Sequence, residues 1–176
     1  MVMLDFSELL ARYRAGDRRF PGVKIEHADE FECDLREIDL FAATINNVYL
    51  PYGNLSRANL QDLVVKQGNL GDAKFTNSNL NRAQLDGVNL SRADLRYARL
   101  REASFCRCNL SGADLTGADL TGADLTEADL TGAALQDADL SQACVIGANF
   151  FRAANLDVAN AKCDRTTILP DGHYYP

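Results

Sequence analysis

Apolar residues recur at every fifth position through most of the chain. From Leu35 to Phe150, each residue whose number is a multiple of five is Leu, Ile, Val or Phe. A small residue stands two positions before most of these centres, and it is alanine at every such position from Ala113 to Ala148. The repeating unit therefore reads A-(D/N)-L-(S/T)-x, with one large and one small apolar position in each five residues.

A period of five fits neither regular element. On an α-helix a step of five turns about 140° past a full turn, so the apolar stripe would wrap around the helix. On a straight strand an odd step alternates between the two faces. We therefore predict a chain that bends once per repeat and directs its centre and small residues inward. One repeat cannot bury its own leucine, so the coils must stack to form a core.

The run GADLTGADLTGADLTEADLTGAALQDADLSQA resembles the pentapeptide-repeat family, and the likeness extends over roughly residues 23–163. The resemblance implies an all-β fold, a right-handed quadrilateral β-helix with four repeats per coil and residues twenty apart in stacks. The segment LLARYRAGDRRF is similar to the N-terminal segment of some cyanobacterial members of the family, including a regulator of heterocyst differentiation.

The N-terminal residues predict a short amphipathic helix over residues 5–15, with Asp5 at the start and Gly16 at the stop. Such a helix would cover the open end of the solenoid. We accordingly divide the chain into three parts. These are an N-terminal helical cap (1–22), the repeat β-helix (23–163) and a C-terminal capping tail (164–176).

Two irregularities interrupt the pattern. Glu30 occupies a centre position, and we expect Phe31 to turn inward in its place, because an unpaired buried carboxylate is costly. Near the other end the string FFRAANLDVANA carries one extra residue, which predicts a bulge between Phe151 and Ala154.

Composition and charge narrow the classes of function. The 176 residues, 47% hydrophobic and 24% charged, suit one globular domain. A net charge of −7 argues against direct nucleic-acid binding, which needs a basic surface. The N-terminal segment has neither a basic start nor a long apolar run, and five cysteines suit a reducing compartment. We therefore expect a cytoplasmic protein with no membrane segment.

No catalytic, cofactor or metal site is expected. His27 and His173 lie at opposite ends of the sequence, and a packed solenoid offers no substrate pocket. The repeated aspartates of residues 114–129 project from successive faces of the coil, so they cannot converge on one ion.

Charge is segregated along the chain. Six arginines lie between residues 82 and 107, whereas residues 111–140 contain Asp and Glu but no Lys or Arg. Ion pairs between coils on an ordinary solvated surface would explain this pattern. The functional hypothesis is a docking surface: a four-sided coil places Arg82, Arg99 and Arg101 on one face and Arg96 on the adjoining face.

Two functions compete. The first is a non-catalytic regulatory scaffold, a monomer or end-to-end dimer, that binds a partner protein through a rigid solenoid face. The alternative follows from the family resemblance: some relatives mimic B-form DNA and bind DNA gyrase. The acidic segment favours mimicry, whereas the arginines in the middle of the rod and the lack of loop insertions oppose it.

Overall fold

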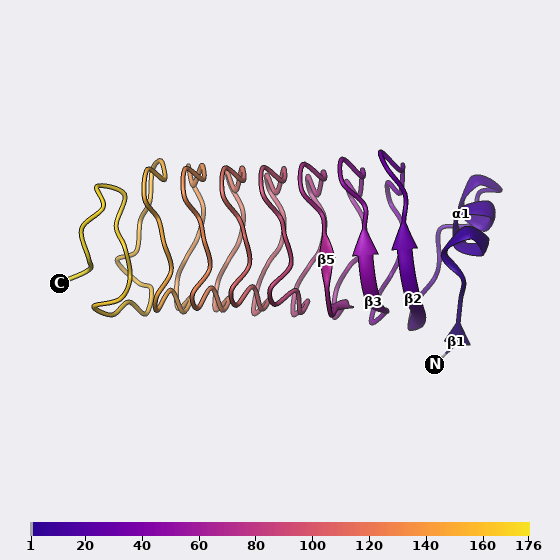
Figure 1. The fold of residues 1–176 in the computed structure, drawn as a ribbon, viewed down its shortest axis with the longest axis horizontal. Coiled ribbons are helices and arrows are strands. Elements are labelled where there is room, and N and C mark those ends of the chain that lie inside the picture. Colours follow the sequence, from indigo (N-terminus) through magenta and orange to yellow (C-terminus); the bar gives the residue numbers. More distant parts are fainter. Residues whose placement is uncertain (1) are drawn as a thin grey trace.

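The computed structural model describes residues 2–176, and they form a rod of stacked coils with the two termini at opposite ends (Figure 1). A single helix lies at the N-terminal end of the rod in this part of the chain. The named elements are β1 (Val2–Met3), α1 (Phe6–Arg14), β2 (Val23–Asp29), β3 (Thr44–Tyr49), β4 (Val64–Val65) and β5 (Gly68–Asn69).

Neighbouring coils pair their backbones in parallel at a fixed spacing. Strand β2 pairs with β3 so that Ile25 lies opposite Ile45, and β3 pairs in turn with β4 and β5. Beyond β5 the same spacing continues through single-residue bridges, as between Asn89 and Asn109. Each regular coil therefore holds twenty residues.

The interior is filled as the period predicts. Every centre from Leu35 to Phe150 is buried. Each such side chain contributes about 1.5–3 kcal/mol of burial free energy. At most junctions between segments the chain turns through one residue in the left-handed region, which is glycine at some corners and a larger residue at others. The exceptions are His27, Asn47 and Gln67, and the first two lie inside the continuous strands β2 and β3. Gly112 has φ 66° and Arg82 has φ 58° at equivalent corners.

The small inner position is matched between neighbouring coils. Val48 fills an inner position that is alanine in most of the five-residue repeats, and the residue stacked on it in the next coil is Gly68. A Cβ atom added to Gly68 would lie 2.0 Å from Val48 Cγ1 and 2.6 Å from the Val48 carbonyl oxygen. A larger inner side chain in one coil is thus accommodated by the missing side chain in the next.

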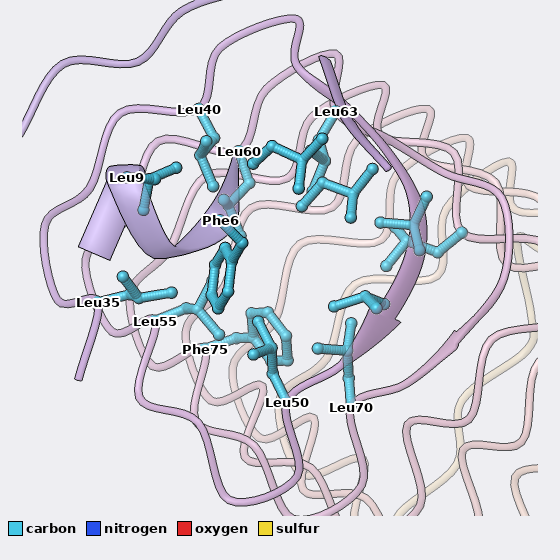
Figure 2. A pocket seen from close by; sticks show the side chains of 15 residues that line it. Phe6, Leu9, Leu35, Leu40, Leu50, Leu55, Leu60, Leu63, Leu70 and Phe75 are labelled. Atoms are coloured by element: carbon cyan, nitrogen blue, oxygen red, sulfur yellow. The ribbon is translucent and has the colours of Figure 1, made fainter. Parts of the chain in front are cut away.

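Helix α1 covers the first coil. Asp5 precedes it, and its carboxylate accepts a 2.8 Å hydrogen bond from the Ser7 backbone N–H, which confirms the predicted start. Phe6 and Leu9 face the open end of the coils, where an apolar cavity of about 20 Å³ lies between the helix and the first coils (Figure 2). Tyr13 donates a 2.9 Å hydrogen bond from its hydroxyl to the Arg36 carbonyl.

The prediction for Phe31 was wrong. Its side chain is 60% exposed, and its ring packs on Tyr52 with 5.3 Å between centroids. Glu30 keeps the register, because its backbone N–H donates a 3.0 Å bond to the Tyr49 carbonyl. Its carboxylate lies 3.7 Å from the Arg14 guanidinium and is partly exposed to solvent. The charge is therefore not buried, although Glu30 occupies a centre position.

The expected bulge between Phe151 and Ala154 was also wrong. Ala154 still pairs with Ala134 at the regular spacing of twenty. The irregularity follows it: Cys144 pairs with Lys162 at a spacing of eighteen and Asn149 pairs with Ile168 at a spacing of nineteen, so the last coil is first two residues and then one residue short. Ala153 is buried at the regular inner position of its repeat. The five-residue pattern of buried positions therefore continues as far as this residue.

The C-terminal tail adds to the ladder. Ile168 pairs in parallel with Asn149 and in antiparallel with Tyr174, so the tail folds back on itself. The buried Thr167 hydroxyl donates a 2.8 Å hydrogen bond to the Val145 carbonyl. The tail is therefore fixed to the last coil by backbone and side-chain hydrogen bonds.

The contact between Val48 and Gly68 gives a test of the packing. We expect Gly68→Ala to lower the free energy of unfolding by about 1–3 kcal/mol, because the new methyl overlaps Val48. Val48→Ala removes the overlap with Cγ1 but not the close approach to the Val48 carbonyl oxygen, so the double variant should recover part of the loss and be more stable than the sum of the two single effects predicts. Urea unfolding of the four proteins measures this, and additive effects would contradict the matched packing.

Candidate partner-binding surface

The four arginines singled out in the sequence form what we call the arginine belt: Arg82, Arg96, Arg99 and Arg101. All four side chains are exposed. The twenty-residue register stacks the segment around Leu80 on the segment around Leu100, which brings Arg82, Arg99 and Arg101 to one side of the coil. Arg96 precedes the corner that leads onto this side.

Two belt arginines are engaged by aspartates of neighbouring coils. Arg82 makes a forked contact with Asp62, with Nε and Nη2 at 2.8 and 2.9 Å from the two carboxylate oxygens. Arg101 Nε lies 2.8 Å from Asp119 Oδ2. The bond from Arg82 is the main reason that the pKa of Asp62 is held below its ordinary value. These contacts join successive coils and partly neutralise the belt.

Arg96 is held within its own segment. Its guanidinium contacts both oxygens of Asp94 at 2.8 and 2.7 Å, and Asp114 of the next coil lies 3.7 Å away. The hydrogen bond from Arg96 is the largest cause of a lowered pKa at Asp94, and the bonds from the Arg96 backbone and the Thr76 hydroxyl act in the same direction.

Arg99 differs from the other three. Within residues 2–176 its guanidinium forms no ion pair, although Asp119 is its neighbour in the ladder and Asn79 lies on the other side. Asp119 instead contacts Arg101. Arg99 is therefore the belt cation whose charge and donors are available to another molecule.

Tyr97 precedes Arg99 by two residues in the chain, and its role at this surface was missed in the sequence. Its side chain is 58% exposed, and its backbone occupies a left-handed corner with φ 57°. The ring lies against Gly117 of the next coil, where an added Cβ would come within 2.6 Å of the ring. The signal was available as the string Arg96-Tyr97-Ala98-Arg99, in which an aromatic residue takes a corner that is often glycine.

The acidic stretch does not form one face. Asp124, Asp129 and Asp139 lie in different segments of the coil, and Asp137 occupies a corner between two of them. Asp114 and Asp119 are already close to arginines of the belt. The remaining carboxylates therefore surround the rod.

Other chemistry was searched for in the same part of the chain. Among residues 2–176, no cluster of three or more His, Cys, Asp or Glu side chains is arranged to hold a metal ion. No helix in this range is both long and apolar enough to cross a membrane.

Parallel coils of twenty residues, each filled by alternating large and small side chains, define a β-helical solenoid protein. The family model described as pentapeptide repeats matches in eight copies over residues 54–92, 89–126 and 113–150, which together span more than half of the chain. The protein therefore belongs to the pentapeptide-repeat family, and its repeats imply a right-handed β-helix.

Several solved structures are similar to this chain. Rfr23, a pentapeptide-repeat protein of the cyanobacterium Cyanothece 51142, is 25% identical with a TM-score of 0.49, over 78% of this chain and 88% of its own. HetL, involved in regulating heterocyst differentiation in Nostoc, is 26% identical with a TM-score of 0.31, over 98% and 100%. QnrB1, a plasmid-mediated fluoroquinolone resistance protein, is 23% identical with a TM-score of 0.44, over 93% and 90%. No curated protein matches the chain.

The contact between Arg96 and Asp94 gives a pH-dependent test. Because the pKa of Asp94 is lowered in the folded state, its contribution to stability is present above the unfolded value of about 3.9 and disappears as the pH falls through the folded value. We expect Asp94→Asn to destabilise the protein at pH 7 by about 0.2–1 kcal/mol, because the Arg96 side chain is 48% exposed and solvent screens its attraction to the partly buried Asp94. The difference from wild type should shrink toward pH 3.

Urea unfolding at the two pH values measures this difference. The matched control is Asp137→Asn, because the Asp137 carboxylate accepts a 2.8 Å bond from the neutral Gln136 amide. If Asp94→Asn lowers the free energy of unfolding by the same amount at both pH values, the lost stability does not come from the ion pair between Asp94 and Arg96.

Proposed function

We propose that this protein is a non-catalytic, cytoplasmic regulatory scaffold. It binds a partner protein where two flat faces of its four-sided coil meet at Tyr97. The observation that carries the proposal is an exposed Tyr97 followed two residues later by an exposed Arg99 that forms no ion pair with a carboxylate of the described chain. Arg82, Arg96 and Arg101 surround this pair.

The residue types suit a binding surface. Tyrosine and arginine are enriched among the residues that dominate protein interfaces, because each combines a broad apolar surface with polar groups. Tyr97 is moreover held against Gly117, so little side-chain entropy is lost on binding. A tyrosine in a left-handed corner is less favourable than glycine, which stands at the equivalent corner in the next coil.

The ion pairs define what the partner presents. Arg82 and Arg101 already bind Asp62 and Asp119, so a partner gains little by offering them further carboxylates. Arg99 can receive a carboxylate in a forked geometry, while the Tyr97 ring receives an apolar side chain. We therefore propose a protein partner with an exposed Asp or Glu beside an apolar residue.

Two substitutions test this surface. We expect Arg99→Glu and Tyr97→Gly each to weaken capture of the partner from an extract of the source cell by about tenfold or more, because interface residues of these types often contribute over 2 kcal/mol. Arg165→Glu is the matched control, since Arg165 is exposed and lies in the C-terminal tail. Quantitative mass spectrometry compares the captured proteins.

Folding is checked separately, and Tyr97→Gly should melt close to wild type because glycine suits the left-handed corner. If Arg99→Glu, Tyr97→Gly and Arg165→Glu all capture the partner equally well, the partner does not bind at Tyr97 and Arg99.

DNA mimicry is the second candidate, favoured by the stretch of residues 111–140 that lacks Lys and Arg. Its charge density is low. The ladder from Arg19 to Asp139 makes six steps, which is about 29 Å at about 4.8 Å a step. A duplex of that length carries about 17 phosphate charges, against a net charge of −7 for the whole chain.

We therefore expect no effect on DNA gyrase. A supercoiling assay with purified gyrase and increasing amounts of the protein should give unchanged product, with and without a fluoroquinolone. Inhibition or protection that is lost when Asp124 and Asp129 are changed to Asn, and kept in Arg99→Glu, would establish mimicry and exclude the scaffold proposal.

A further inference from the structure

A second surface lies near the N-terminal end of the rod. It combines exposed aromatic rings with negative charge, whereas the corner at Tyr97 and Arg99 carries positive charge. Three aromatic side chains, which we call the aromatic face, are exposed there: Phe31 by 60%, Tyr49 by 51% and Tyr52 by 46%. The rings of Phe31 and Tyr52 pack at 5.3 Å with a tilt of 58°. Tyr49 ends β3, and Tyr52 follows in the next turn.

The residues around these rings are mostly acidic, and the exception is Arg92 of the following coil, whose side chain interacts with Tyr52 as well as with Asp72. The stacked segments 28–32, 48–52 and 68–72 contain four carboxylates and no Lys or Arg. Asp72 is paired with Arg92 at 2.6 Å, and Glu30 lies 3.7 Å from Arg14. Within residues 2–176, Asp29 and Glu32 form no ion pair, so the aromatic face carries uncompensated negative charge.

A hollow adjoins the aromatic face. It measures about 270 Å³ and is lined by the ends of the paired strands β2 and β3, with Asp29, Tyr49 and His27 among its lining residues. Asp29 and Tyr49 are partners in the backbone ladder. The hollow therefore offers a carboxylate and an aromatic ring side by side, which together bind a cationic side chain: the ring by cation–π attraction and the carboxylate by a charge-assisted hydrogen bond.

We propose that the aromatic face binds a Lys- or Arg-bearing extended segment of a partner protein. Three exposed rings within two coils give such a segment an apolar surface, and Asp29 and Glu32 give it charge complementarity. Nucleic acid is disfavoured by the same charge. The surface is separate from the Tyr97 and Arg99 corner, so this proposal does not rest on the proposed function.

Binding of a basic probe peptide to the full-length protein tests the aromatic rings. The probe is a fluorescein-labelled peptide of four Gly-Arg repeats, measured by fluorescence anisotropy at physiological ionic strength. We expect Phe31→Ala and Tyr52→Gly each to weaken binding by about threefold, and the double variant by about tenfold, as cation–π contacts at exposed sites imply. Tyr174→Ala is the control, because it also removes an exposed aromatic ring, far from the aromatic face.

The second arm tests the carboxylates. The double variant Asp29→Asn and Glu32→Gln should weaken binding by about tenfold, because both charged partners of the peptide are removed. The control double variant Asp137→Asn and Asp157→Asn removes the same charge elsewhere and should bind like wild type. Melting temperatures check folding, and Tyr49→Ala replaces any aromatic variant that fails to fold.

Three results would overturn the proposal. The first is unchanged affinity in the aromatic double variant. The second is equal weakening in the two charge variants, which would mean that the peptide responds only to net charge. The third is a dimer in sedimentation analysis of the unliganded protein that Phe31→Ala with Tyr52→Gly dissociates, because the face would then belong to a second copy of the chain.

Discussion

The fixed length of the coil is the constraint on which the rest of the structure depends. Backbone N–H and C=O groups of one coil pair with those of the next, as when the Leu80 N–H donates to the Arg99 carbonyl at 2.8 Å. The register between regular coils stays constant because each holds twenty residues, and at the last coil the ladder continues with spacings of eighteen and nineteen. Side-chain neighbours are consequently set by number: a residue lies next to the residue twenty positions away, whether the pair is Val48 and Gly68 or Arg82 and Asp62.

This constraint divides the surface into positions of different freedom. Side chains at inner positions must fit the side chains stacked on them, so a larger residue in one coil requires a smaller residue in the next, as at Val48 and Gly68. The corners must adopt a left-handed backbone, and eighteen of them in the described chain carry a residue other than glycine. Such a residue is less favourable there by about 1–2 kcal/mol. Many of these corner side chains form ion pairs between coils, but Tyr52 and Tyr97 expose a large aromatic surface instead.

The period of five predicted the buried centres, the bends and, with the family resemblance, the coil of twenty residues. The same arithmetic predicted which belt arginines share a side. It also pointed to Asp62 below Arg82, although that pairing was recognised only in the structure. The ends were not predictable in this way, because they lack one stacked neighbour. Phe31 turns outward where Glu30 reaches Arg14, and the last coil shortens after Ala154.

A rigid rod with two surfaces of opposite chemistry constrains its partners more than either surface does alone. The aromatic face lies on the coils that contain β2 and β3, whereas Tyr97 lies farther along the rod on another segment of the coil. Because stacked coils cannot change their spacing without breaking backbone hydrogen bonds, the separation of the two surfaces is fixed. A partner that presents a basic segment and an acidic group at the matching separation gains from both contacts, since the second binding event is then intramolecular. A partner with either feature alone does not.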